Sequence, residues 1–180
     1  MNSKINQKKI FSVIAIALMV AFVPKAFADA VSVSHSVSLA VPTTLAFSAN
    51  ETNFTLTFAD YIATSETDTK SVTYTVKANN MTKTAGVVTA KLDALYDNID
   101  FKADVGSYTK TSGNGSLKET AAGFTTITAA SAVNLADRQT DSGNGKTVRG
   151  TLPITYKATA KEDLSAQTLT GVLTISLIDA

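Results

Sequence analysis

Apolar and polar residues alternate in short segments along most of the chain after residue 28. Phe54, Leu56 and Phe58, for example, fall on one face of an extended segment. Alternation with a period of two, bounded by turn residues, is typical of half-buried strands. The pattern predicts strands at residues 54–58, 72–76, 87–92, 99–105, 123–130, 151–160 and 168–178.

No segment has a sustained period of 3.6 residues, so the sequence predicts an all-β protein. The motif SGNG occurs at 112–115 and 142–145, and its Asn-Gly pairs tolerate positive φ, which indicates two independent turns. Pro153 lies inside a strand-like segment. Because proline lacks the N–H that a central strand uses, we expect Pro153 at an edge or a strand start. The spacing favours an immunoglobulin-like β-sandwich of about seven or eight strands.

The first 28 residues have the pattern of a secretory signal peptide. A basic start precedes an apolar run at 10–23, and Ala26 and Ala28 place small residues before a cleavage site. The run is shorter than the roughly 20 residues that span a bilayer. We expect cleavage between Ala28 and Asp29, export through the periplasm, and no membrane span in the remaining chain.

The most regular alternation follows this leader, in residues 29–41. Valine or leucine recurs at every second position apart from His35, and the residues between are Ser or Ala. The alternation at 31–41 is about twice the mean strand length of 5–6 residues. It is either the first strand of its own sandwich or a strand that completes the sheet of another subunit, a known binding mode. Its length and its small intervening residues favour the second interpretation.

Composition excludes several classes of function. Four of the 16 basic residues lie in the leader, which leaves 12 against 15 acidic residues and no basic cluster. Nucleic acid and anionic membranes are therefore not expected as partners. The chain has no cysteine and one histidine, His35, so thiol catalysis, thiolate metal sites and a two-histidine metal site are excluded within one chain.

Two carboxylate pairs are the remaining candidates for acid–base chemistry or calcium binding. They are Asp97 with Asp100, and Asp137 with Asp141. Aspartate is an ordinary turn residue, and we favour solvated turns at both places. We expect no enzymatic activity, no cofactor and no metal.

This layout resembles that of a known family. A leader, an alternating N-terminal extension, a cysteine-free β-sandwich and an apolar terminal segment GVLTISLI at 171–178 are similar to subunits of chaperone–usher pili, closest to the cysteine-free colonisation-factor pilins. The resemblance implies a sandwich that lacks its last strand and receives the N-terminal extension of the next subunit. It also implies a periplasmic chaperone and an outer-membrane usher as partners. The implied donor residues are Val31, Val33, His35, Val37, Leu39 and Val41, and the implied groove and chaperone-contact residues are Val172, Leu173, Ile175, Leu177 and Ile178.

These observations predict three parts: a signal peptide at 1–28, a donor strand at 29–41 and a pilin-like β-sandwich at 42–180. The expected function is that of a structural subunit of a fimbria at the cell surface, which polymerises with identical chains by donor-strand exchange and serves adhesion or biofilm formation. The alternatives are a monomeric exported β-sandwich that binds a surface glycan or protein, and an exported hydrolase. For His35 two interpretations stay open: burial among apolar pockets, which would weaken the polymer in acid, or a solvated position.

Overall fold

The computed structural model describes residue 36 and residues 38–179. It divides into two units, Met1–Ala40 and Val41–Ala180, and the described residues of the first unit have no regular secondary structure. The leader, the cleavage site at Ala28 and Asp29, and the donor positions Val31, Val33, His35 and Val37 lie outside the described residues.

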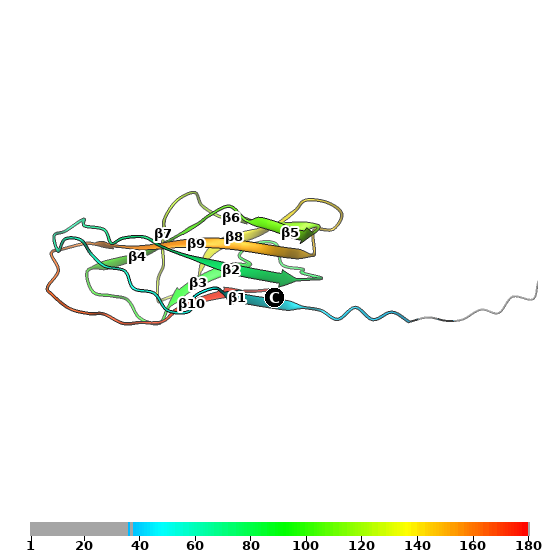
Figure 1. Cartoon of the computed structure of the whole chain (residues 1–180), viewed down its shortest axis with the longest axis horizontal. Coiled ribbons are helices and arrows are strands. Elements are labelled where there is room, and N and C mark those ends of the chain that lie inside the picture. The colour runs from blue at the N-terminus through cyan, green and yellow to red at the C-terminus, as the bar shows by residue number, and fades with distance from the viewer. Residues whose placement is uncertain (1–35, 37, 180) are drawn as a thin grey trace, which may run out of the picture. The chain divides into compact units, whose positions relative to one another are not determined.

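The described residues form ten strands and no helix, which confirms the all-β prediction (Figure 1). The strands are β1 (Leu45–Ala49), β2 (Lys70–Ala78), β3 (Val88–Leu92), β4 (Ile99–Val105), β5 (Thr109–Gly113), β6 (Gly115–Glu119), β7 (Thr125–Thr126), β8 (Val133–Thr140), β9 (Val148–Ala160) and β10 (Leu173–Leu177). The expected seven or eight strands were too few, because β1, β5, β6 and β8 were not predicted. Three of them, β5, β6 and β8, are largely polar and lack a clean alternation.

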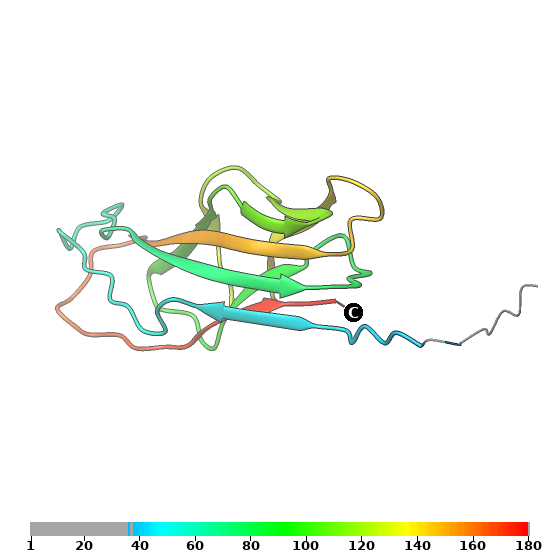
Figure 2. The same ribbon diagram turned by 45° about the vertical axis from the view of Figure 1, so that its right-hand side comes forward.

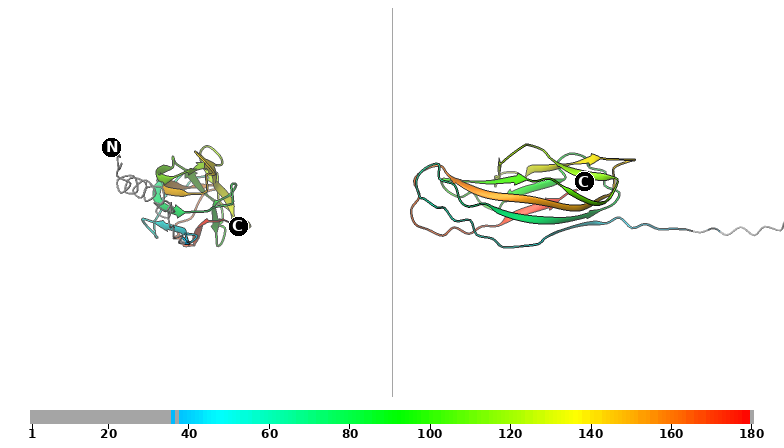
Figure 3. Two further views of the ribbon diagram at one scale, coloured as in Figure 1. Left: turned by 90° about the vertical axis from the view of Figure 1, so that its right-hand side faces the viewer. Right: turned by 45° about the horizontal axis from the view of Figure 1, so that its top comes forward.

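The strands form two antiparallel sheets that pack as a β-sandwich (Figure 3). One sheet has the order β1-β2-β9-β4-β7, with β5 also paired to β9, and the other has the order β10-β3-β8-β6. The longest strand, β9, has 13 residues. It pairs with β2 on one side, and with β4 and then β5 on the other. The larger sheet is therefore organised around β9.

The core lies between the sheets and consists of the inward side chains of both. Alternate residues of β9 are buried, including Leu152, Ile154 and Tyr156. Tyr156 and Tyr74 share a hydrogen bond of 2.8 Å between their hydroxyl oxygens, and burial raises the pKa of both. Each fully buried aliphatic side chain contributes roughly 1.5–3 kcal/mol. The core therefore stabilises a chain that has no disulfide.

Pro153 lies in the middle of β9, so the expectation of an edge or a strand start was wrong. Its carbonyl oxygen accepts a hydrogen bond from Gly106 N–H at 2.9 Å. In an antiparallel ladder the N and O of one residue point to the same neighbour. On that side β4 ends at Val105 and β5 begins at Thr109. The proline nitrogen therefore faces the gap between two strands, where no hydrogen bond is lost.

Residues 54–58 do not form the predicted strand, although their side chains alternate as expected. Phe54 and Leu56 pack against the core, and Phe54 stacks on Tyr156 with ring centroids 5.1 Å apart. The segment has one isolated bridge, Phe58 with Thr67. It is extended but has no neighbouring strand with which to form a ladder.

The two SGNG segments, at 112–115 and 142–145, are in contact in the structure. The Asn114 side-chain amide donates to Asn144 Oδ1 at 2.9 Å, and Asn114 Oδ1 accepts from Thr147 N–H. At this point the chain passes from β5 in one sheet to β6 in the other. Gly113 has a φ of 101°, and a Cβ there would lie 2.3 Å from the Thr147 carbonyl oxygen. The crossing therefore requires glycine for both conformation and space.

We expect Gly113→Ala to lower the free energy of unfolding by about 2–4 kcal/mol, from the left-handed backbone and the added contact together. Gly123 is the matched control, because it has a φ of 80° but open space around its Cα. Gly123→Ala should cost about 1–2 kcal/mol, from the backbone alone. Urea unfolding of both variants measures the difference, and equal losses would contradict the close approach at Thr147.

The connections between strands gather at two ends of the sandwich unit. Residues 50–69, 93–98 and 161–172 connect strands at one end, which we call the distal end (left in Figure 1). Residues 79–87 and 141–147 lie at the opposite, proximal end, where β1 begins and β10 ends.

Candidate functional site: the open edge of the sandwich

The two sheets each end in an unpaired strand on the same side of the sandwich. Within residues 38–179, β1 pairs only with β2, and β10 pairs only with β3. The two edge strands lie next to each other, with some Cα atoms within 8 Å, but belong to different sheets (Figure 2). Free edges of this kind present unpaired N–H and C=O groups and are templates for a further strand.

The inward side chains of both edge strands are only partly covered. Leu173, Ile175 and Leu177 of β10 pack against the core but remain half-buried. Phe47 of β1 is also half-buried and stacks on Tyr74, with ring centroids 5.0 Å apart. Inward residues of the central strand β9, such as Ile154, are 0% exposed. The core is therefore closed in the middle of the sandwich and open along this edge.

Residues 53–58 extend the open edge beyond β1 toward the distal end. Among the described residues, their backbone hydrogen bonds involve Thr57 alone: Thr57 N–H donates to Asp68 Oδ1, and its carbonyl oxygen accepts from Asp68 N–H. The side chains still alternate between inward and outward positions. The side chains of this segment therefore alternate as in a strand, but its backbone has no ladder of hydrogen bonds to a neighbouring strand.

Two carboxylates hold β10 in place at its ends. At its start, Asp93 Oδ1 accepts from Val172 N–H at 2.9 Å, and Asp93 N–H donates to Val172 O. After its end, Asp179 Oδ1 accepts from Thr82 N–H at 2.6 Å and from Lys83 N–H at 2.9 Å. These bonds fix the position of the edge strand without a neighbour on its open side.

The residues expected to line a groove occupy different positions. Leu173, Ile175 and Leu177 face the core, as described above. Val172 is 60% exposed at the distal end, and Ile178 is half-buried and donates its N–H to Val87 O at 2.8 Å.

The expected donor residues that the structure describes are exposed. Leu39 is 88% exposed and Val41 is 82% exposed. Both large apolar side chains are therefore uncovered in the isolated chain.

Asn79 fixes the residues that lead from Val41 into β1. Its backbone N–H donates to Thr44 O at 3.0 Å, its side-chain amide donates to Pro42 O at 2.9 Å, and its Oδ1 accepts from Thr44 N–H. Because Leu45 pairs with Ala78, residues 42–44 continue the direction of β1 with no reversal. Asn79, Asp93 and Asp179 were not predicted from sequence, because each acts through contacts with a distant segment.

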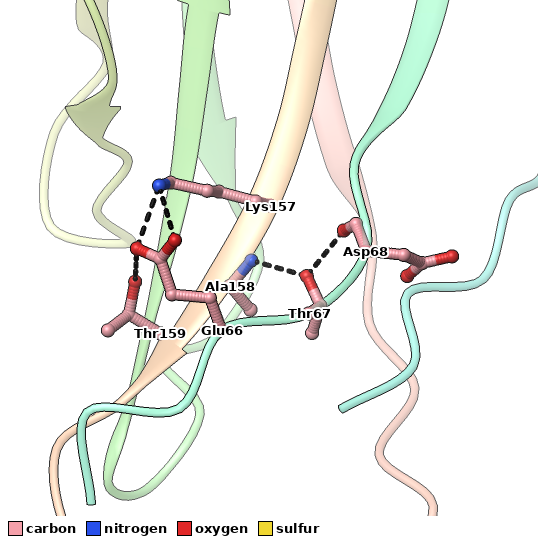
Figure 4. Close-up of polar contacts among 6 residues, drawn as sticks. All are labelled: Glu66, Thr67, Asp68, Lys157, Ala158 and Thr159. Atoms are coloured by element: carbon pink, nitrogen blue, oxygen red, sulfur yellow. Dashed lines mark hydrogen bonds and ion pairs between the residues drawn. The ribbon is translucent and has the colours of Figure 1, made fainter. Parts of the chain in front are cut away.

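The densest polar cluster lies on the outer face, at the end of β9 (Figure 4). Lys157 Nζ donates to both Glu66 carboxylate oxygens, at 2.7 and 2.8 Å, and lies 4.3 Å from the Phe124 ring centroid. The hydrogen bond from Lys157 lowers the pKa of Glu66. Thr67 Oγ1 accepts from Ala158 N–H at 3.0 Å. The cluster attaches the segment before β2 to β9. The carboxylate of Glu66 is already paired with Lys157.

The candidate carboxylates have separate partners. Asp100 pairs with Lys161 at 2.8 Å, and Asp137 Oδ1 accepts from Gly86 N–H at 2.6 Å. Asp141 accepts from Ser116 and Lys110, which lower its pKa. Asp100, Asp137 and Asp141 therefore hold loops and strands together. Asp97 and Asp100 line one shallow pocket together with Lys161, which is already paired with Asp100.

Comparisons with protein-family models, with curated proteins and with solved structures give no match. Within the described residues, no helix is long and apolar enough to cross a membrane. The functional argument therefore depends on the geometry of the open edge.

We expect Asp179→Ala to lower the free energy of unfolding by about 1–3 kcal/mol, because it removes an ionised acceptor from two backbone N–H groups. Glu162→Ala is the matched control, since Glu162 is an exposed acidic residue in the segment before β10. Its removal should change stability by at most about 0.5 kcal/mol. Thermal unfolding compares the two variants, and equal stabilities would show that Asp179 does not hold β10.

Proposed function

We propose that this chain is a structural subunit of an extracellular fibre. In this proposal residues 29–41 of one chain enter the open edge of an identical chain, between β1 and β10. The fold is then an immunoglobulin-like sandwich that lacks one strand. Fibres at the cell surface would serve adhesion or biofilm formation.

The observation that carries the proposal is the pair of unpaired edge strands on one side of the sandwich. A single added strand would cover Phe47, Leu173, Ile175 and Leu177 together, because all four belong to the same open edge. It would also give residues 53–58 the ladder they lack. Strand addition of this kind gains affinity from backbone hydrogen bonds and specificity from alternate side chains.

The segment at 29–41 has the chemistry that this edge requires. Its five large apolar side chains contribute roughly 1.5–3 kcal/mol each when buried. Ordering the chain costs about 1–2 kcal/mol per residue. Ordering the 13 residues therefore costs more than burial of the five side chains contributes, so the backbone ladder must contribute as well if the complex is to be stable.

Insertion requires the edge to open. A strand that pairs on both sides separates its neighbours by roughly 9.5 Å, twice the usual interstrand spacing, whereas some Cα atoms of β1 and β10 are within 8 Å of each other. The edge strands must therefore move apart first. This requirement supports a role for a periplasmic chaperone that holds the edge open and for an outer-membrane usher that exchanges it for the next chain.

The proposal predicts opposite effects for aspartate at neighbouring positions of residues 29–41. Leu39→Asp places a charge among apolar side chains and should abolish the polymer, because an unpaired buried charge is costly. Ser38→Asp places the same charge on the other face of the strand and should leave polymers intact. A denaturing gel of unheated and boiled samples measures this as a ladder that heat removes.

A single band from the wild-type chain in both the unheated and the boiled sample would contradict the proposal and favour a monomeric binding protein. A ladder that is equally strong in Leu39→Asp and Ser38→Asp would show that chains associate without burying the donor side chains.

A further inference from the structure

Two basic residues lie directly opposite each other on the outer face of the larger sheet, near the proximal end. Lys77 of β2 pairs with Arg149 of β9 in the antiparallel ladder. Both residues are exposed, whereas their neighbours Val76 and Val148 are buried, so the two basic side chains point outward. Opposite residues of a ladder have Cβ atoms roughly 4.5–5.5 Å apart, and like charges there are destabilising. The fold therefore brings two positive charges together at a cost to its own stability.

No carboxylate compensates this pair. Within the described residues, neither Lys77 nor Arg149 forms an ion pair. Their partners on the flanking strands are neutral, because Ala46 of β1 pairs with Lys77 and Ser112 of β5 pairs with Arg149. The other basic residues of β2, β5 and β9 each have a carboxylate partner, and they are Lys70, Lys110 and Lys157. The pair is thus the exception among the basic residues of these three strands.

Hydroxyl groups surround the two cations in a small pocket of about 200 Å³. Thr75 and Thr151 form the next outward pair of the same two strands, and Thr111 and Ser112 of β5 complete the lining. In the part of the chain that the structure describes, none of these four hydroxyl groups has a hydrogen-bond partner. A hydroxyl group can donate to an anion, so the pocket combines two cations with four unused donors. We call it the basic pocket, and it consists of Thr75, Lys77, Thr111, Ser112, Arg149 and Thr151.

We infer that the basic pocket binds a phosphate or sulfate group. The planar guanidinium of an arginine such as Arg149 matches two oxygens of such a group, and the ammonium of a lysine such as Lys77 acts as a point charge beside it. An anion between the two cations replaces their repulsion by two attractions. The basic pocket belongs to β2, β5 and β9 and not to the open edge, so it is independent of the proposed fibre.

The arrangement of the donors favours a tetrahedral oxyanion over a planar carboxylate. The donors come from three neighbouring strands: Lys77 from β2, Arg149 from β9 and Ser112 from β5. A carboxylate has two oxygens that accept hydrogen bonds, whereas phosphate and sulfate have four. A tetrahedral group can therefore accept from all three strands at once.

The size of the pocket and the charge of the chain both select a small ligand. The pocket is smaller than the roughly 300–1,000 Å³ of sites that enclose a whole small molecule. The chain after residue 28 has 12 basic against 15 acidic residues, so a long polyanion would be repelled outside the basic pocket. Because Lys77 and Arg149 are exposed, the pocket is open to solvent. The group can therefore be a free ion or the end of a small phosphate or sulfate monoester.

Equilibrium dialysis with radioactive inorganic phosphate tests the inference, with sodium chloride added to keep the ionic strength constant. We expect the wild-type chain to bind phosphate saturably. Lys77→Gln and Arg149→Gln should each weaken binding about tenfold or more, because each removes a charged donor. The matched control is Lys91→Gln, since Lys91 is exposed and pairs with the neutral Thr174, and it should bind as the wild type does. Equal losses in all three variants, or no saturable binding by the wild type, would overturn the inference.

Competition identifies the chemical group that the pocket accepts. Sulfate and glucose 6-phosphate should displace the radioactive phosphate, whereas acetate and glucose should not. Acetate that competes as well as sulfate would overturn the assignment of a tetrahedral oxyanion. Failure of glucose 6-phosphate to compete would also overturn the inference, because a pocket open to solvent accepts a monoester.

Thermal unfolding gives a second measurement on the same variants. A ligand that binds the folded chain raises the unfolding midpoint, although phosphate also stabilises folded proteins in general. At equal ionic strength, replacing chloride by phosphate should raise the midpoint of the wild type and of Lys91→Gln more than that of the double variant with Lys77→Gln and Arg149→Gln. Equal rises in all three chains would show a general salt effect and overturn the inference.

Discussion

The unpaired edges of two facing sheets determine how this protein is organised. Strands β1 and β10 each lack one neighbour, and they do so on the same side of the sandwich. Water can bind the unpaired backbone groups of such an edge, but it cannot cover the apolar side chains behind it. The half-buried residues along this edge, such as Ile175, follow directly from the missing neighbour.

The rest of the molecule keeps this edge in place while it is empty. The central strand β9 is paired on both sides and carries the most buried part of the core. Asp93 and Asp179 hold the two ends of β10 through backbone N–H groups, and Asn79 sets the direction in which the chain enters β1. The edge strands are thus ordered before a strand is added, and binding does not have to order them. They must still move apart to admit the strand, because some Cα atoms of β1 and β10 lie within 8 Å of each other.

The alternation of apolar and polar residues predicted the strands that have one apolar face. It failed where a bulge or a buried polar residue interrupts the period of two. Strands β2, β4 and β9 follow the predicted pattern closely. The pairing of β8 with β3 shifts register beside Val88. Two consecutive residues of β8, Leu135 and Ala136, are both buried. Arg138 is buried as well, and its guanidinium donates to the carbonyl oxygens of Lys83 and Gly145. A buried arginine and a bulge remove the period of two, so the sequence does not reveal this strand.

The candidate site was predictable in its apolar part only. The terminal segment at 171–178 was expected to line a groove and contact a chaperone. Its strand β10 lies at the edge of a sheet, and the groove and the chaperone contact stay predictions. The prediction of a strand at 54–58 was wrong because alternation reports which side chains face inward and not whether a neighbour is present. Asn79, Asp93 and Asp179 act across long sequence separations. Ordinary polar residues in turns give no sign of such contacts.

Amide hydrogen exchange of β10 tests the central claim most directly. The N–H groups of β10 that do not pair with β3 should exchange rapidly in the isolated chain. They should become strongly protected in assembled material, together with those of residues 29–41, because a new ladder would form along that edge. Equal exchange of β10 before and after assembly would contradict the account, since the edge would then remain empty in the fibre.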